Sequence, residues 1–172
     1  MEIKNISADA LPDYFSSLCT LLRNCVEAGA SIGFLTPLTD VELQTFWHGV
    51  AQGLAQHQRR LFVAVTDGEV TGTVQLVLDM PANGRHRAEI VKLMVAPHAR
   101  RMGVGRALMQ LAMQAAKDER RSLLVLDTRS GDAAEPLYLS LGFNVAGRIP
   151  GYARSTEGDL DATTIMFKQL NL

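Results

Sequence analysis

The spacing of apolar residues predicts helices in the first third of the chain. Between residues 8 and 27 apolar side chains recur close to helical spacing, at Leu11, Phe15, Leu18, Leu21, Leu22 and Cys25. Two glycines interrupt this pattern in the segment 28–34, and Thr39 is the expected N-cap of a second helix that continues to about residue 56. A short strand over residues 2–7 precedes both helices.

The pattern then changes to the alternation typical of strands. We expect strands over residues 61–66, 69–79 and 87–95. The turn pair Asp67-Gly68 joins the first two, and a turn at residues 81–84 joins the second to the third. These three strands therefore form an antiparallel meander.

The last third combines both periodicities. A helix over residues 103–119 leads into an apolar strand over 122–128, so the third strand of the meander and this strand form a βαβ unit with a parallel pair. A short helix over 133–141 and strands over 144–152 and 162–169 complete the chain. The predicted fold class is α/β (α+β), with about seven strands and about four helices in a mixed sheet.

Composition limits the classes of protein to consider. The 172 residues are 47% hydrophobic and 20% charged, which is typical of one globular domain spanning residues 1–172. A net charge of -1 argues against a nucleic-acid partner, and no apolar run is long enough for a signal peptide or a membrane span. We expect a cytoplasmic protein without a membrane partner. Whether two copies assemble as a homodimer is left open.

The two cysteines do not suggest a metal site. Cys19 and Cys25 lie six residues apart in one predicted helix, so they point in different directions and form neither a CxxC pair nor a metal cluster. We expect both to be buried apolar residues.

The segment 95–108 carries the strongest functional signal. A strand runs into a helix whose first turn contains Gly103 and Gly105, so unpaired backbone N–H groups can approach an anion without obstruction by Cβ atoms. Arg100, Arg101 and Arg106 add positive charge, and the combination suits a pyrophosphate. The loop lacks the Lys-Ser/Thr pair of a Walker motif and the third glycine of a dinucleotide fingerprint, while tight strand-to-helix packing is an alternative role for its glycines.

Two motifs resemble the GCN5-related N-acetyltransferases. Arg100, Gly103 and Gly105 match that family's Arg/Gln-x-x-Gly-x-Gly/Ala loop, and residues 134–143 resemble its second signature, Ala-x-x-Leu-Tyr-x-x-x-Gly-Phe. The resemblance implies the family's fold and acetyl-CoA as cosubstrate, without a metal. It implies cofactor contacts from one continuous stretch of the chain: Leu93, Met94, Val95, Arg100, Arg101, Met102, Gly103, Val104, Gly105 and Arg106. At Gly131 the sequence departs from relatives that place an asparagine there.

The resemblance also implies where the chemistry occurs. Tyr138 occupies the family's general-acid position, and a backbone N–H around Leu93 or Met94 is expected to meet the oxyanion. Glu89 and Asp127 lie on the two strands expected to part around the cosubstrate, so either carboxylate is a candidate base. Asp127 follows an apolar run, and dry surroundings would raise its pKa. Packing for Tyr138, and capping or ion pairing for the carboxylates, are the structural alternatives.

The acceptor is the least defined part of the prediction. Four segments, 28–34, 88–95, 126–128 and 149–152, resemble tabtoxin-resistance acetyltransferases, which implies a small, amino-acid-like amine and a role in toxin or antibiotic detoxification. Arg87, Arg148 and Arg154 are candidates to receive a substrate carboxylate. A CoA-binding sensor without turnover and a protein N-terminal or lysine acetyltransferase remain the alternatives.

Overall fold

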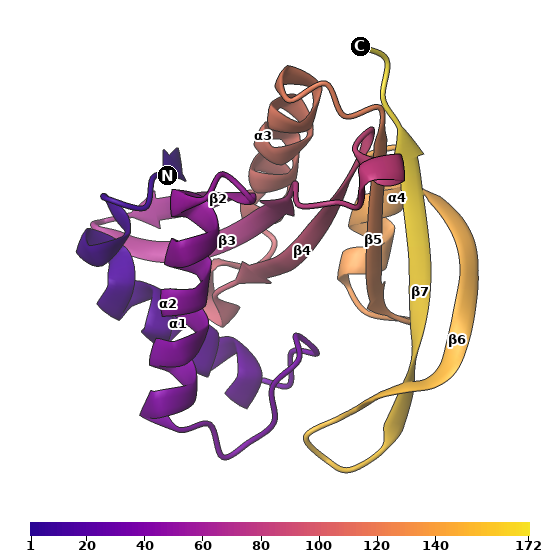
Figure 1. The fold of residues 1–172 in the computed structure, drawn as a ribbon. Helices are drawn as coiled ribbons and strands as arrows, with labels where there is room; N and C mark the ends of the chain where they lie inside the picture. The colour runs from indigo at the N-terminus through magenta and orange to yellow at the C-terminus, as the bar shows by residue number, and fades with distance from the viewer.

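A computed structural model describes residues 1–172, and its centre is one twisted sheet of seven strands in the order β1-β2-β3-β4-β5-β7-β6 (Figure 1). Every neighbouring pair is antiparallel except β4 and β5. The strands are β1 (Glu2–Ile6), β2 (Arg59–Thr66), β3 (Glu69–Val77), β4 (Arg87–Val95), β5 (Leu123–Arg129), β6 (Asn144–Arg154) and β7 (Leu160–Gln169). The predicted meander and the single parallel pair are confirmed.

Helices cover both faces of the sheet. Helices α1 (Phe15–Glu27) and α2 (Asp40–Ala55) pack on one face, while α3 (Val104–Asp118) packs on the other, against β2, β3 and β4 (Figure 1). Helix α4 (Ala134–Ser140) contacts β5. Three short 3-10 turns, η1 (Leu11–Tyr14), η2 (Ala82–Gly84) and η3 (Pro97–Ala99), complete the regular structure.

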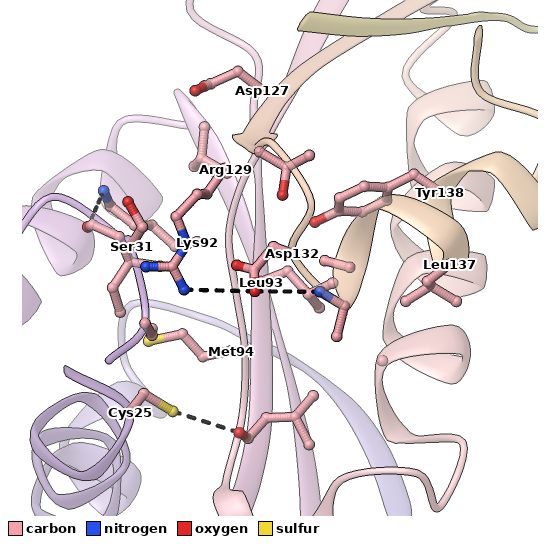
Figure 2. A pocket seen from close by; sticks show the side chains of 18 of the residues that line it. Cys25, Ser31, Lys92, Leu93, Met94, Asp127, Arg129, Asp132, Leu137 and Tyr138 are labelled. Carbon is pink, nitrogen blue, oxygen red and sulfur yellow. Dashed lines mark hydrogen bonds and ion pairs between the residues drawn. The ribbon is translucent and has the colours of Figure 1, made fainter. Parts of the chain in front are cut away.

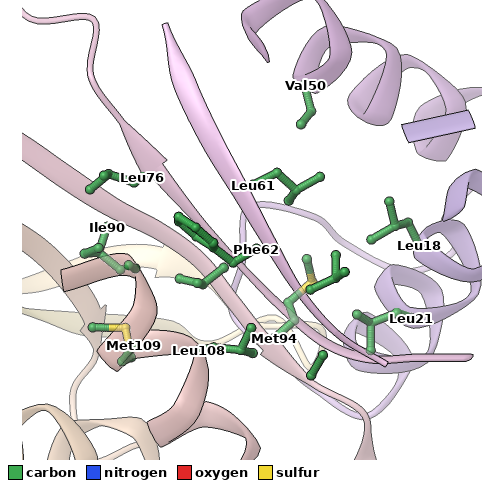
Figure 3. Packing of buried hydrophobic residues seen from close by; sticks show 14 of the residues in the cluster. Leu18, Leu21, Val50, Leu61, Phe62, Leu76, Ile90, Met94, Leu108 and Met109 are labelled. Atoms are coloured by element: carbon green, nitrogen blue, oxygen red, sulfur yellow. The ribbon is translucent and has the colours of Figure 1, made fainter. Parts of the chain in front are cut away.

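The core lies on both sides of the N-terminal strands (Figure 3). Leu18 and Leu21 of α1 approach the sheet from one side, and Leu108 and Met109 of α3 approach it from the other (Figure 3). All four side chains are almost fully buried. Because both faces of β2 and β3 are covered, these strands are buried along most of their length, and on β3 the buried residues include the polar Thr71, Thr73 and Gln75.

Several details of the helices differ from the prediction. Thr39 does cap α2, in a capping box with Glu42. Cys25 is buried, but Cys19 is only partly covered, so the expectation for Cys19 was wrong. On α3 the buried stripe runs through Met109 and Ala116, whereas Leu111 and Ala115 are only half-buried.

The parallel pairing of β4 with β5 is short, and the position where it ends determines where the two strands separate. Strands β4 and β5 pair only where residues 87–89 of β4 lie beside residues 123–125 of β5. Beyond this point the register of β4 with β3 shifts, and Lys92 adopts a left-handed backbone conformation with φ of 56°. The two strands therefore diverge toward their carboxyl ends (Figure 1).

The hairpin of β6 and β7 is longer than predicted, because β6 continues to Arg154 and β7 begins at Leu160. Its turn faces the loop between α1 and α2, and together they line a smaller hollow beside Arg129. None of the helices is both long and apolar enough to cross a membrane.

Candidate active site

A cleft of about 1130 Å³ opens where β4 and β5 diverge. Its walls come from the α1–α2 loop, both diverging strands, the start of α3, the start of α4 and the first half of β7. Figure 2 shows Lys92 and Ser31 on one side of this cleft and Tyr138 and Leu137 on the other. Elements far apart in the sequence thus meet at one cavity.

The glycine-bearing loop forms one end of the cleft. Gly103 is the N-cap of α3 and has a φ of 80°, a left-handed conformation that glycine adopts without strain. A Cβ at Gly105 would lie 3.2 Å from Leu137 Cδ2, so this position holds α3 close to α4. Gly105 therefore has a packing role, while Gly103 starts the helix without side-chain atoms over its first turn.

Positive charge surrounds the loop. Arg100 and Arg101 are exposed, and both line the cleft. Arg106 donates a hydrogen bond of 2.7 Å to Ser140 Oγ, which ties α3 to the end of α4. No carboxylate forms an ion pair with any of these three arginines, so their charge is available to an anion at the start of α3.

Strand β4 forms the floor of the cleft. Leu93, Met94 and Val95 all line it. The register pairs Met94 with Thr73 and Val91 with Gln75, so the irregular stretch between them contains Lys92 and Leu93. At this bulge one residue of β4 does not take part in the regular backbone hydrogen bonding with β3. One of its backbone polar groups is therefore free to hydrogen-bond a ligand in the cleft.

Tyr138 lies on α4 and is 5% exposed. Its ring packs against Phe143 at 5.9 Å between centroids, while its hydroxyl points into the cleft (Figure 2). Burial, reinforced by the negative charges of Asp132 and Asp127, raises the pKa of Tyr138 well above its ordinary value. The phenol is therefore protonated at neutral pH and can donate a proton or a hydrogen bond.

The two candidate carboxylates have different surroundings. Glu89 is half-buried, and burial together with the nearby Asp127 raises its pKa. Asp127 is exposed and accepts a 2.7 Å hydrogen bond from the hydroxyl of Thr163. The expected dry environment of Asp127 was wrong, because its side chain faces the open cleft rather than the apolar layer beneath the strand.

Two cations in the cleft were not singled out from the sequence. Lys92 Nζ donates a 2.6 Å hydrogen bond to the carbonyl oxygen of Ile32, and Arg129 Nη1 donates one of 3.1 Å to that of Gly29. Both side chains thus hold the α1–α2 loop against the sheet. A charged residue inside the apolar strand 88–95 was the available signal for Lys92.

The cleft brings together nearly all of the predicted site residues. Glu89, Asp127, Tyr138 and every predicted cofactor contact except Met102 line it; Met102 is 69% exposed and lies outside. The three arginines considered for a substrate carboxylate do not line it. Arg148 pairs with Glu135, Arg154 donates to the carbonyl of Gly158, and Arg87 packs against Gly84, so that expectation was wrong.

Trp47 and His98 lie away from the cleft. Trp47 is fully buried in the core under α2, and His98 is exposed on η3. Neither lines the cleft. No group of three or more His, Cys, Asp or Glu side chains is arranged to hold a metal ion.

Comparisons with known proteins agree with this geometry. The model of the acetyltransferase (GNAT) family matches residues 21–143. The chain is 31% identical over 121 residues to an uncharacterized N-acetyltransferase in the hisH-hisA intergenic region of Azospirillum brasilense, covering 69% of this chain and 70% of that protein. It is 36% identical over 95 residues to N-acetyltransferase 8F1 of Mus musculus, covering 54% of this chain but only 42% of the mouse protein.

Solved structures share the fold over the whole chain. The structure of yncA from Salmonella typhimurium with its cofactor acetyl-CoA superposes with a TM-score of 0.80, covering 100% of this chain and 95% of that one. The sequences are 22% identical. This likeness confirms the predicted arrangement of strands and helices.

Proposed function

The chain belongs to the acetyltransferase (GNAT) family, and from this premise we propose that it transfers the acetyl group of acetyl-CoA to the amine of a small molecule. One observation carries the proposal. A single cleft is lined by the glycine-bearing loop with its unpaired arginines, by the bulged strand β4, by the buried phenol of Tyr138 and by the carboxylates of Glu89 and Asp127. These are the parts that acetyl transfer from a thioester to an amine needs.

The loop supports acetyl-CoA as the cosubstrate. Backbone N–H groups at the start of α3 and the unpaired Arg100 and Arg101 suit a pyrophosphate, and Leu93 to Val95 can run beside an extended pantetheine arm. The similar Salmonella structure holds acetyl-CoA, which supports the same cosubstrate here. The acetyl-CoA thioester supplies the activated acyl group, and the residues of this chain orient it and move protons.

The bulge in β4 supports a role in charge stabilisation. When the amine nitrogen bonds to the thioester carbonyl carbon, negative charge develops on the carbonyl oxygen. A backbone N–H around Leu93 or Met94, released from regular pairing, can donate to that oxygen. The carbonyl then re-forms as the carbon–sulfur bond breaks.

Tyr138 supports the second half of the reaction. The departing thiolate needs a proton, and the protonated phenol of Tyr138 supplies one from the α4 side of the cleft. Solvent then returns the proton to the phenolate.

The amine must lose a proton before or during attack. An alkyl ammonium has a pKa near 10, so most of the substrate arrives protonated. Glu89 and Asp127 both face the cleft, and Glu89 is the better base because burial shifts its pKa toward neutrality. Asp127, fixed by Thr163, is suited to hold the ammonium or an intervening water.

A small-molecule acceptor fits the cleft better than a protein acceptor. Lys92 and Arg129 hold the α1–α2 loop against the sheet, so this loop forms one wall of the cleft. Segments 28–34 and 88–95, which resemble tabtoxin-resistance acetyltransferases, both contribute to that wall. A detoxification role stays a prediction that rests on this resemblance alone.

The test is a thiol-release assay with purified protein, acetyl-CoA and a panel of small primary amines, with acetylated products identified by mass spectrometry. Acetylation of at least one amine, lost in Tyr138→Phe, would support the enzyme. Binding of acetyl-CoA without amine-dependent thiol release across the panel would instead favour a CoA-binding sensor, and acetylation only of peptide amines would favour a protein acetyltransferase.

A further inference from the structure

The acceptor side of the cleft, formed by the α1–α2 loop, β4 and β5, contains a cation without an acidic partner. Lys92 lines the cleft and is half-buried, yet no carboxylate of the chain lies within ion-pair distance of its ammonium. Its one hydrogen bond, of 2.6 Å, goes to the carbonyl oxygen of Ile32. An ammonium has three N–H donors, so two of them remain for a ligand.

The backbone of β4 turns Lys92 toward the cleft instead of into the core. Two residues of β4, Lys92 and Leu93, lie opposite one residue of β3, Val74, which is a β-bulge. In a regular strand Lys92 would share the face of Ile90, which is buried in the core. The bulge and the left-handed φ of 56° bring Lys92 to the other face. Lysine seldom adopts this conformation, and such backbone strain is concentrated at functional sites.

Burial makes the unpaired charge of Lys92 costly. It lowers the pKa of this ammonium, and the negative charges of Asp127 and Glu89 offset only part of the shift. The nearby Arg59, which is also half-buried and forms no ion pair, adds to the lowering. A negatively charged group of a ligand beside Lys92 would favour its charged form and supply the partner that it lacks.

Arg129, the other cation beside the α1–α2 loop, is already engaged. Its guanidinium donates to the carbonyl oxygen of Gly29 and lies 3.5 Å from Asp132 and 3.7 Å from Asp161 (Figure 2). A ligand carboxylate would have to displace one of these protein carboxylates and would then face the charge of the displaced group. Lys92 is therefore the better placed of the two cations to bind an anionic group.

We propose that Lys92 binds a carboxylate of the acceptor, so that the substrate is an amine that also carries one carboxylate. The inference rests on the proposed function and narrows its substrate class. The carboxylate accepts hydrogen bonds from the two remaining N–H groups of Lys92, while Asp127 and Glu89 hold the ammonium and take its proton. Those two acidic side chains would repel a group with a double negative charge, so a single carboxylate is the anion that fits.

The experiment compares each of four acids with two counterparts that lack the negative charge. The acids are L-leucine, L-phenylalanine, L-lysine and 4-aminobutyrate; the counterparts are the primary amide, which keeps the shape of the carboxylate, and the decarboxylated amine. Thiol release gives kcat/KM, expressed per unprotonated amine because the three forms differ in the pKa of the amine. For each acid that reacts, kcat/KM should exceed that of both counterparts by about tenfold, the scale of one hydrogen bond between charged groups.

A matched pair of variants locates the effect. Lys92→Met removes the ammonium and keeps an unbranched side chain, so the preference for the acid should fall to about twofold or less. The loss of the bond to Ile32 affects the acid and its counterparts alike, so the ratio isolates the charge. Lys117→Met, on the exposed side of α3 and outside the cleft, should leave the ratio as in the wild type.

The outcomes separate this inference from the proposed function. An amide or decarboxylated amine that reacts as fast as its acid, or reaction only of panel amines without a carboxylate, would overturn the assignment and leave the acetyltransferase in place. An unchanged preference in Lys92→Met would also overturn it and make Lys92 a tie for the loop alone. The wild-type comparison decides the matter even if Lys92→Met fails to fold. No thiol release with any amine, despite acetyl-CoA binding, would overturn the proposed function itself.

Discussion

The hydroxyl of Thr163 on β7 donates a 2.7 Å hydrogen bond to the carboxylate of Asp127 on β5. The same hydroxyl lies 3.1 Å from the carbonyl oxygen of Thr128, so Thr163 joins the two strands where the cleft begins. This contact fixes one carboxylate in the exposed part of the cleft, while Glu89 on β4 is half-buried opposite it. The two acidic groups therefore differ in what they can do.

Glu89 should control the acidic limb of the pH–rate profile. A base must be ionised, and its raised pKa places the loss of activity closer to neutrality than an ordinary carboxyl would. Glu89→Gln should lower kcat/KM and flatten that limb, whereas Asp127→Asn should raise KM for the amine and keep the limb. A limb that disappears only in Asp127→Asn would reverse the two roles.

Glu89 should also make stability depend on pH. Its pKa is higher in the folded protein than in the unfolded chain, so ionisation costs stability. The cost is absent below the unfolded carboxyl pKa and complete above the raised folded one. Glu89→Gln should therefore match the wild-type Tm near pH 4 and exceed it near pH 8. Equal differences at both pH values would show that the effect is one of packing.

The loop glycines should be required for acetyl-CoA binding. Gly103→Val forces a β-branched residue to a φ of 80° at the start of α3, where the backbone N–H groups must approach the pyrophosphate. Acetyl-CoA at 100 times its Kd stabilises the native state by about 2.7 kcal/mol, and the variant should lose most of the corresponding rise in Tm.

Gly158→Val is the matched control for that variant. Gly158 also has a left-handed conformation, with a φ of 97°, but lies in the β6–β7 turn outside the cleft. It should lower the Tm of the protein alone and preserve the rise on adding acetyl-CoA. A full rise in Gly103→Val would assign the pyrophosphate to another place.

The helices and strands could be predicted from the sequence because each has its own spacing of apolar residues and is bounded by residues typical of helix ends and turns. Thr39, the expected N-cap of the second helix, marks a helix start by local chemistry, and the two motifs contain the glycine-bearing loop and Tyr138, which line one cleft. The exposure of Asp127 was not predictable in the same way. It depends on where β5 parts from β4, which no local pattern of residues 122–128 records.

The acceptor wall depended even more on long-range contacts. Arg129 reaches Gly29, 100 residues away, and Lys92 reaches Ile32, 60 residues away. The bulge that contains Lys92 depends on how β4 pairs with β3, so the sequence of either strand alone does not reveal it.

Arg129 should position the α1–α2 loop without contributing to cosubstrate binding. Arg129→Met removes the bond to Gly29 and both carboxylate contacts, so amide hydrogen exchange in residues 28–33 should accelerate. KM for the amine should rise severalfold, while the Kd for acetyl-CoA stays within about twofold.

Arg60→Met is the control for Arg129→Met, since this guanidinium pairs with Glu119 and lines neither the cleft nor the hollow beside Arg129. It should change neither the exchange rates of residues 28–33 nor KM. Wild-type exchange in Arg129→Met would mean that the loop is held by its own packing.

The central claim is that this cleft transfers an acetyl group and that Tyr138 protonates the departing thiolate. Tyr138→Phe removes one hydroxyl and keeps the ring that packs against Phe143, so the fold and the cofactor loop stay intact. The most direct measurement is kcat for thiol release beside the Kd for acetyl-CoA, in wild type and Tyr138→Phe. The account predicts a fall in kcat of about 10²-fold with an unchanged Kd, the scale of a positioned general acid. A Phe variant with full turnover, or one whose only defect is weaker acetyl-CoA binding, would contradict it.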